Sequence, residues 1–458
     1  MQNIEKIHLI GIGGSGMISL ANLLVELNYS ITGSDINYNE KFDKLIKKGA
    51  KIYLNNSPKN ILNSNVVIYS SAIKPDNVEL IEAKKLGKKI YHRVDFIKKL
   101  TENKKVIGIA GTHGKTTTTA MLSYLFKKIG LSPSLYFGGE NDEFFFGSSI
   151  GNGDYFILET DEHDESFLKF DIYLPIITNI DRDHLDNFGP FKGDFDLLKE
   201  SFLKFIEKSK SGRAILSIDC PNIYNLIKRI DKDILSYSIE NDQATLFGKI
   251  NKGGHLNSGE IFYKKKKIGN LELSIPGDKY FLNSLGVVLA SIEEGLDTDE
   301  VLKILKGFKG VKRRFEIVYD DDLTIIDDHA DHPTEIGVTL KIAKDYYKDR
   351  RIISIIEPHR YSRVKNLYKE YPDGFKLSDI IILLPIDPAD EIDSLGVDTE
   401  IIHDEAKKKY SDKSIFYLDK KSVILFLKDI MKKEDVIIFM GPGKIKNLVK
   451  EFLLEIKR

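Results

Sequence analysis

The chain has 458 residues, too many for one ordinary hydrophobic core, which favours two or three domains. Its 68 basic residues nearly balance 69 acidic ones, so no general electrostatic field attracts nucleic acid or an acidic membrane. No apolar run approaches the roughly 20 residues of a membrane helix, and no signal-peptide pattern opens the chain. The single cysteine, Cys220, excludes an internal disulfide. We therefore expect a cytoplasmic globular protein, a monomer or homodimer, with neither nucleic acid nor membrane as a partner.

The first hundred residues alternate short apolar runs with helical patterns, which is typical of a parallel β-sheet. Strands are expected at residues 7–11, 30–34, 66–70 and 89–91, with a helix at 17–27. A Gly-x-Gly-x-x-Gly motif lies between the first strand and that helix, and it comprises Gly11, Gly13, Gly14, Ser15 and Gly16. Taken alone, it predicts a dinucleotide cofactor with Asp35 on a ribose. The diphosphate of a UDP-linked substrate would meet the same geometric demand.

A second unit is expected after the polar stretch 99–105, which we interpret as a linker. Its predicted strands lie at residues 106–110, 155–160 and 173–179, and its helices at 116–129, 195–206, 282–294 and 299–308. Glycine-rich turns between residues 245 and 274 predict an insert of short antiparallel strands. The four lysines at 264–267 favour a solvated hairpin edge over a binding patch.

The strongest signal is a glycine-rich run at residues 108–117 that follows an apolar strand and enters a helix. Glycines let backbone N–H groups wrap a phosphate chain, and the helix N-terminus adds partial positive charge. Lys115 would neutralise the β- and γ-phosphates of ATP, and the Thr116 hydroxyl would ligate Mg²⁺. A tight turn without a ligand is the alternative, which the full Gly-x-x-Gly-Lys-Thr-Thr pattern disfavours. The predicted ATP-binding residues here are Gly111, Thr112, His113, Gly114, Lys115, Thr116 and Thr117.

Two acidic runs, at residues 159–164 and 179–186, each follow a predicted strand of this second unit. A carboxylate at a strand end can reach metal ions that bridge nucleotide phosphates. Each run alone is more typical of a solvated loop. Two of them in the unit that carries the phosphate loop favour a metal site.

A third unit is expected to start near Arg314 and to form another α/β sheet, because strands and helices alternate in it. Its strands are predicted at residues 324–327, 351–356, 379–384 and 436–440. The chain is therefore predicted to be an α/β protein of three domains, at residues 1–100, 101–311 and 312–458.

These motifs, in this order, resemble the Mur ligases of cell-wall synthesis, most closely the branch that joins L-alanine to UDP-N-acetylmuramate. The most specific stretches are residues 7–17, 33–35, 70–73, 109–121, 159–167, 178–186, 313–315, 327–335 and 358–363. The resemblance implies Rossmann-like N- and C-terminal domains around a central P-loop ATPase-type domain. It also implies an acyl phosphate, formed from a UDP-linked carboxylate and ATP and then attacked by the amine of an amino acid.

The resemblance assigns further roles residue by residue. Lys115, Glu159, His184 and Arg314 match catalytic positions, and Thr116, Glu159 and His184 match metal ligands for Mg²⁺ and a second divalent ion. Asn283, Arg314 and Asp328 match residues that reach the nucleotide. The UDP-linked substrate is expected on the first glycine motif together with Ser34, Asp35, Ser70, Ser71 and Ala72. The amino acid is expected between His329, Asp331, His332, Arg360 and Arg363.

The sequence departs from the family pattern at the substrate pockets. His329 stands where the family has an aromatic tyrosine, and Asp331 stands where it has the first histidine of a pair. A carboxylate at position 331 would repel an acidic amino acid and could favour a basic one. Lys279-Tyr280 replaces a His-Asn pair, so that Tyr280 could stack on adenine, and Lys444 replaces an Asp or Asn.

These changes leave several interpretations open. Drift within one enzyme is the simplest, and an archaeal pseudomurein peptide ligase with a different, basic amino acid is the sharper alternative. A dehydrogenase would rest on the first glycine motif alone. A non-catalytic sensor would be expected to lose Lys115, Glu159 or His184, and all three are present.

Overall fold

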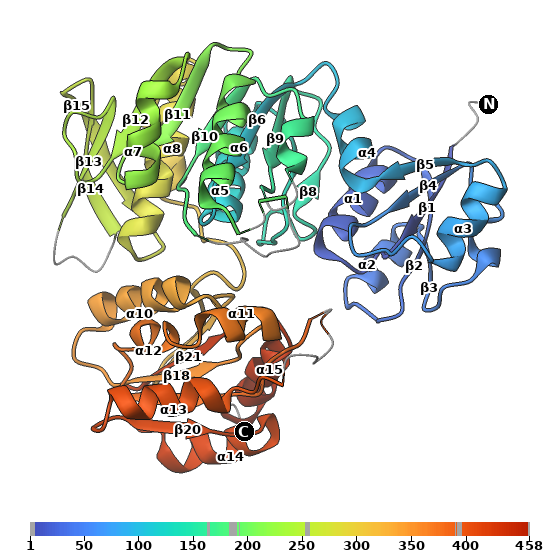
Figure 1. Ribbon diagram of the computed structural model, residues 1–458. Helices are drawn as coiled ribbons and strands as arrows, with labels where there is room; N and C mark the ends of the chain where they lie inside the picture. Colours follow the sequence, from blue (N-terminus) through green and yellow to red (C-terminus); the bar gives the residue numbers. More distant parts are fainter. Residues whose placement is uncertain are drawn as a thin grey trace. The chain divides into compact units, whose positions relative to one another are not determined.

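The computed structural model describes residues 5–162, 165–182, 190–191, 193–251, 257–389, 391 and 396–456. The chain divides into two compact units, Met1–Lys309 and Gly310–Arg458. The first unit carries two β-sheets and the second carries one (Figure 1). Among the described residues, no helix has the length and apolar character to cross a membrane.

The first sheet is parallel throughout, with the strand order β3-β2-β1-β4-β5. Its strands are β1 Lys6–Ile10, β2 Ser30–Ser34, β3 Lys51–Tyr53, β4 Val66–Tyr69 and β5 Lys89–His92. Its helices are α1 Ser15–Glu26, α2 Phe42–Lys47, α3 Val78–Lys85 and α4 Arg93–Leu100. Successive residues of β1 point to opposite faces, so that Leu9 packs with α1, α2 and α4 while Ile10 packs with α3. Burial on both faces explains why β1 and β4 are mainly apolar.

The second sheet has ten strands in the order β15-β14-β13-β12-β11-β10-β6-β9-β7-β8. The strands are β6 Lys105–Ala110, β7 Ser134–Tyr136, β8 Ser148–Ser149, β9 Tyr155–Glu159, β10 Leu174–Ile177, β11 Arg213–Ser217, β12 Asp233–Ser238, β13 Leu246–Ile250, β14 Asn257–Tyr263 and β15 Lys266–Leu273. The helices are α5 Lys115–Lys128, α6 Phe195–Glu207, α7 Pro221–Leu226, α8 Asp278–Glu293 and α9 Thr298–Leu305. The phosphate-loop strand β6 lies between β9 and β10, in the parallel part of the sheet.

The third sheet has the order β16-β17-β21-β18-β19-β20, with only β16 antiparallel to its neighbour. The strands are β16 Glu316–Asp320, β17 Thr324–Asp328, β18 Ile352–Ile356, β19 Ile380–Leu383, β20 Ser414–Tyr417 and β21 Val436–Met440. The helices are α10 Pro333–Tyr347, α11 Tyr361–Leu367, α12 Tyr371–Gly374, α13 Glu400–Lys409, α14 Lys420–Ile430 and α15 Ile445–Ile456. The carboxyl ends of β17, β18 and β21 meet at one edge, where a ligand site is expected in an open α/β sheet.

The α/β class with three sheets is confirmed, and most predicted strands agree within one or two residues. The antiparallel strands at 245–274 are confirmed, but they extend the second sheet through the pairing of β13 with β12 instead of forming a separate insert. The lysines at 264 and 265 form the hairpin turn between β14 and β15. The linker predicted at 99–105 is shorter than expected, because α4 continues to Leu100 and β6 begins at Lys105. The three domain borders stay a prediction.

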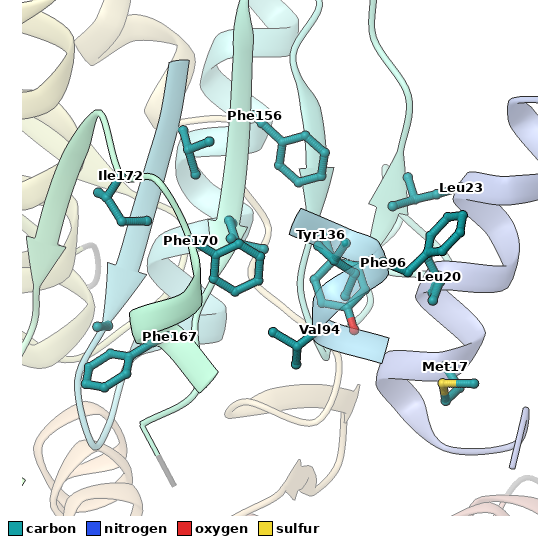
Figure 2. Close-up of a cluster of buried hydrophobic side chains, with 14 of the residues drawn as sticks. Met17, Leu20, Leu23, Val94, Phe96, Tyr136, Phe156, Phe167, Phe170 and Ile172 are labelled. Carbon is teal, nitrogen blue, oxygen red and sulfur yellow. The ribbon is translucent and has the colours of Figure 1, made fainter. Parts of the chain in front are cut away.

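The first two sheets share one hydrophobic core, which explains their union in one compact unit. Met17, Leu20 and Leu23 of α1 and Val94 and Phe96 of α4 belong to the same buried cluster as residues of the second sheet (Figure 2). The residues from the second sheet are Tyr136 of β7 and Phe156 of β9, and the segment between β9 and β10 adds Phe167, Phe170 and Ile172. The glycine motif before α1 is therefore held on the same packed body as the phosphate loop.

Candidate active site

The phosphate loop joins β6 to α5 through two glycines with positive φ, Gly111 at 137° and Gly114 at 84°. A Cβ atom on Gly111 would lie 2.2 Å from the Thr178 hydroxyl oxygen, and one on Gly114 would lie 2.8 Å from the Asn283 amide nitrogen. Neither position has room for a side chain. The structure thus brings Asn283, which is far away in sequence, against the loop, as the predicted nucleotide site requires.

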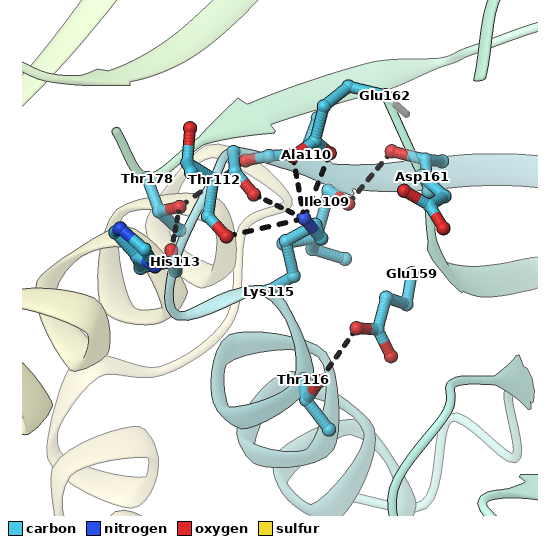
Figure 3. Close-up of polar contacts among 12 residues, drawn as sticks. Ile109, Ala110, Thr112, His113, Lys115, Thr116, Glu159, Asp161, Glu162 and Thr178 are labelled. Atoms are coloured by element: carbon cyan, nitrogen blue, oxygen red, sulfur yellow. Dashed lines mark hydrogen bonds and ion pairs between the residues drawn. The ribbon is translucent and has the colours of Figure 1, made fainter. Parts of the chain in front are cut away.

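Lys115, the first residue of α5, is held by a buried carboxylate from the loop after β9. Its ammonium group lies 2.9 and 2.8 Å from the two carboxylate oxygens of Glu162 and donates to the Gly111 carbonyl at 2.6 Å (Figure 3). Burial lowers the pKa of Lys115, but Glu162, Asp161 and Glu159 outweigh it, so the pKa lies above its usual value. Lys115 therefore stays a cation. Glu162 belongs to the acidic run noted in the sequence, but its pairing with Lys115 was not predicted.

Thr116 and Glu159, which were expected as ligands of Mg²⁺ and of a second divalent ion respectively, lie together beside this lysine. The Thr116 hydroxyl donates to one carboxylate oxygen of Glu159 at 2.6 Å (Figure 3). The Gly138 N–H donates to the other oxygen at 2.7 Å. A hydroxyl and a carboxylate oxygen suit Mg²⁺, which commonly takes few protein ligands together with phosphate oxygens and water. Over the described part of the chain, no cluster of three or more His, Cys, Asp or Glu residues could hold a metal by itself. His184, the other predicted metal ligand, lies outside the described residues.

The loop backbone is fixed from the end of β10. The Asn179 side chain accepts from the His113 N–H at 2.9 Å and donates to the His113 carbonyl at 2.8 Å. The Thr112 hydroxyl accepts from the Asp181 N–H at 2.8 Å, and Thr117 is buried in the first turn of α5. Asn179 opens the second acidic run, so the sequence marked this segment without revealing that it anchors the loop.

The first glycine motif is held by the ends of β2 and β4. The Asp35 carboxylate accepts from the Gly13 N–H at 2.8 Å, and the Ser34 carbonyl accepts from the Gly11 and Ile12 N–H groups. A Cβ atom on Gly11 would lie 2.9 Å from the Ser70 hydroxyl oxygen, whereas Gly14, Ser15, Ser71 and Ala72 are exposed at the same edge. Ser71 contacts the His92 ring at 3.1 Å. The predicted UDP-site residues therefore lie together at the carboxyl ends of parallel strands.

Ser34 differs from the others, because its side chain is fully buried. Its hydroxyl donates to Glu79 at 2.5 Å and lies 3.4 Å from His8, so only its backbone is available to the loop. Burial raises the pKa of Glu79, but hydrogen bonds from His8, Ser34 and the Ser57 backbone bring it below the usual value. His8 and Glu79 are polar residues within an apolar strand and a helix, and no sequence signal connected them to Ser34.

In the second compact unit, the residues predicted to reach the nucleotide surround the end of β17. The buried Asp328 carboxylate accepts from the Phe315 N–H at 2.6 Å and from the Ala330 N–H at 2.8 Å. Burial raises the pKa of Asp328 to about 6 although nearby Arg314 opposes this shift. Burial, reinforced by Arg314, lowers the pKa of His329 to about 3, so its ring is neutral. This neutral ring can stand in for an aromatic side chain.

Arg313, which was not predicted as a site residue, ties β17 to the loop after β21. Its guanidinium contacts both carboxylate oxygens of Asp327 and donates to the carbonyls of Gly441 and Pro442. These bonds bring together the carboxyl ends of two strands that are neighbours in the sheet but distant in sequence.

Asp331, at the predicted amino-acid pocket, has its charge compensated. Its carboxylate forms an ion pair with Arg363 and lies 3.4 Å from the His359 ring, and its carbonyl accepts from the Tyr371 hydroxyl at 2.9 Å. The expectation that Asp331 favours a basic amino acid is weakened by this pairing. Arg360 has a positive φ of 68° at the start of α11, and His332 caps the N-terminus of α10 by accepting from the Thr334 N–H.

Profiles of one family match consecutive parts of the chain. The profile of the Mur ligase family catalytic domain matches residues 6–105, that of the Mur ligase middle domain 109–291, and that of the Mur ligase glutamate ligase domain 313–443. The UDP-N-acetylmuramate–L-alanine ligase of Dictyoglomus turgidum is 38% identical over 97% of this chain and 96% of its own. The ligase of the same name from Aquifex aeolicus is 34% identical over 99% and 98%.

The fold agrees with these matches. The crystal structure of UDP-N-acetylmuramate-alanine ligase MurC from Thermotoga maritima superposes with a TM-score of 0.84, at 26% identity and over 99% of each chain. The protein is thus an ATP-dependent ligase that forms amide bonds. It belongs to the Mur ligase family, and within that family it is of the MurC type.

The same matches decide two of the alternatives left open by the sequence, the pseudomurein ligase and the dehydrogenase. A pseudomurein peptide ligase type C from Methanothermus fervidus shares the fold with a TM-score of 0.66, but at 20% identity. Relatives named UDP-N-acetylmuramate–L-alanine ligase reach 38%, so the pseudomurein alternative is not favoured. Membership in a family of ligases also rules out the dehydrogenase.

Proposed function

We propose that this ligase joins L-alanine to the carboxylate of UDP-N-acetylmuramate, with ATP and Mg²⁺. The substrates are those in the names of its full-length relatives. The observation that carries the proposal is the arrangement of Lys115, Thr116 and Glu159 at the start of α5, with the first glycine motif on the same compact unit.

In the first step, a carboxylate oxygen of the UDP-linked substrate attacks the γ-phosphorus of ATP, and the bond to the bridging oxygen of ADP breaks. Lys115 and the N–H groups of the loop stabilise charge on the transferred phosphoryl group. A Mg²⁺ ion held by Thr116 and Glu159 would neutralise phosphate oxygens. Arg314 and Asp328 of the second unit are assigned to the nucleotide, and Arg314 adds positive charge.

In the second step, the amine of L-alanine attacks the carbonyl carbon of the acyl phosphate, loses a proton and expels inorganic phosphate. Arg360 and Arg363 are assigned to the amino-acid carboxylate, because a guanidinium can pair with both oxygens. His329 shapes the same pocket with an uncharged ring. The backbone of the glycine motif is assigned to the diphosphate, and Asp35 holds the motif by accepting from the Gly13 N–H, which fixes the position of the attacking carboxylate.

The test is phosphate release by the full chain with ATP, Mg²⁺ and UDP-N-acetylmuramate, with every amino acid supplied singly. A dominant response to L-alanine is expected, and omission of Mg²⁺ should abolish it. A dominant response to another amino acid would overturn the assignment of L-alanine. Activity only with a different UDP-linked carboxylate would overturn the assignment of UDP-N-acetylmuramate as the substrate. Silence with every acceptor would instead support a non-catalytic role.

A further inference from the structure

Tyr136, at the end of β7, contacts the first glycine motif directly. Its hydroxyl donates to the Gly16 carbonyl at 3.0 Å and accepts from the Arg93 guanidinium at 2.7 Å. Arginine has no acceptor, so the single proton of the phenol must point toward Gly16. Burial raises the pKa of Tyr136, outweighing Arg93, so the phenol keeps that proton. The hydroxyl is therefore an oriented donor to the last glycine of the motif.

The absence of a side chain at Gly16 leaves room for this contact. A Cβ atom on it would lie 2.0 Å from the Arg93 guanidinium nitrogen and 2.7 Å from the Tyr136 hydroxyl oxygen. The third glycine of a Gly-x-Gly-x-x-Gly motif commonly permits close packing beside its helix. Here the packing partner is the second sheet, through Tyr136.

The residues after Tyr136 reach the metal carboxylate. The Gly138 N–H donates to Glu159 at 2.7 Å, and the other oxygen of Glu159 accepts from Thr116 at 2.6 Å. Three consecutive residues, 136 to 138, thus connect the Gly16 carbonyl with Glu159. This span is at most about 7 Å between its end Cα atoms.

A second set of bonds holds the same segment to α1. The Ser19 hydroxyl, which is buried, lies 2.7 Å from the Phe146 carbonyl and 3.1 Å from the Phe137 carbonyl. Ser148 donates in return to the Ser19 carbonyl at 2.8 Å. Ser19 and Ser148 are both buried beside the core drawn in Figure 2, so these bonds join α1 to the segment from β7 to β8 away from the surface. The segment therefore has little freedom to move relative to the glycine motif.

We propose that Tyr136 is a positioning residue, which sets the distance between the UDP-substrate loop and the Glu159–Thr116 pair through Gly16 and Gly138. The proposal rests on the proposed function, in which a carboxylate held through the first loop must reach a phosphate held at the second. A misplacement of about 1 Å in such a pair of reactants costs about 100-fold in rate.

The test compares Tyr136→Phe with Tyr237→Phe in the full chain. Tyr237 is also fully buried in the second sheet, and its hydroxyl lies 3.4 Å from the Ile177 carbonyl, remote from the glycine motif. Both variants lose one buried hydroxyl, so the Tm of both should be about a few degrees lower than that of the natural protein. Tyr136→Phe alone is expected to lower kcat about 10- to 100-fold, with KM for ATP within twofold of the natural protein. An unchanged kcat, or an equal loss in both variants, would overturn the proposal.

Amide hydrogen exchange without substrates separates this inference from the proposed function. Tyr136→Phe should speed exchange in residues 11–20 and at Gly138, whereas Tyr237→Phe should leave both segments unchanged. If the natural protein is inactive with UDP-N-acetylmuramate and every amino acid, the proposed function is wrong. Hydrogen exchange then tests by itself whether Tyr136 connects the glycine motif with Gly138. Unchanged exchange at both segments in Tyr136→Phe would then overturn this connection.

Discussion

The ammonium group of Lys115 lies 2.8 Å from a carboxylate oxygen of Glu162, whose side chain is 1% exposed. Removing one partner of a buried ion pair leaves the other as an uncompensated charge, which costs more than losing both together. Substitutions in this pair can therefore distinguish the role of Lys115 in stability from its role in catalysis.

The double substitution Lys115→Met with Glu162→Gln tests this separation. Lys115→Met alone should lower the free energy of unfolding by about 3 kcal/mol, because Glu162 stays buried without its cation. Adding Glu162→Gln should recover much of that loss. ATP-dependent phosphate release should fall at least about 100-fold in both, since neither carries the phosphate-binding cation. Urea unfolding and the phosphate assay measure the two effects, and a double variant as unstable as Lys115→Met would contradict the stability role.

Thr116→Val should specifically weaken the binding of Mg²⁺. Valine keeps the shape of threonine but removes the hydroxyl that faces Glu159 at 2.6 Å. We expect the Mg²⁺ concentration for half-maximal activity to rise about 10- to 100-fold. Thr119→Val is the matched control on the same helix, because its buried hydroxyl donates to the Lys115 carbonyl at 2.9 Å and does not contact Glu159 in the described part of the chain. An equal shift in both variants would argue against Thr116 as a ligand.

The parts of the site that the sequence revealed are those whose chemistry is local. Gly111, Gly114, Lys115 and Thr116 follow one another along the chain, and backbone geometry alone requires the glycines. The apolar strands were recognisable for the same reason, since burial on both faces of a parallel sheet demands continuous apolar runs. The short, partly exposed strands β3 and β20 lack that signal.

The partners of these residues depend on strand order, which the sequence does not display. Glu162 reaches Lys115 because β9 lies on one side of β6, and Asn179 reaches His113 because β10 lies on the other. Asp331 illustrates the same limit. Its residue type suggested an open negative charge, but the fold places Arg363 against it from 32 positions away.

His329 should resist protonation. Its pKa of about 3 lies below the usual value near 6.5. Below pH 6.5, His329 binds a proton in the unfolded chain but not in the folded chain. The free energy of unfolding therefore decreases as pH falls from 6.5 toward 3. Between pH 7.5 and 5, His329→Asn should therefore lose about 2 kcal/mol less free energy of unfolding than the natural protein.

The raised pKa of Asp328 acts in the opposite sense, because the folded protein takes up that proton first as pH falls through about 6. This contribution is common to both proteins and cancels in the comparison. NMR provides a direct check, since the ring nitrogens of His329 should keep the chemical shifts of a neutral imidazole from pH 8 to pH 5. A midpoint near 6.5 would contradict the lowered pKa.

Asp331→Asn should change KM for the amino acid and leave KM for ATP unchanged. Asp331 holds Arg363, which the proposed function assigns to the amino-acid carboxylate, and the two carboxylates compete for one guanidinium. Neutralising Asp331 should lower KM for L-alanine by about fivefold, which corresponds to about 1 kcal/mol of competition for the guanidinium. It should also weaken discrimination against acidic amino acids, because one repulsive charge is removed. KM for ATP serves as the internal control and should stay within twofold. A higher KM for L-alanine would show instead that the ion pair is needed to orient Arg363 for the substrate.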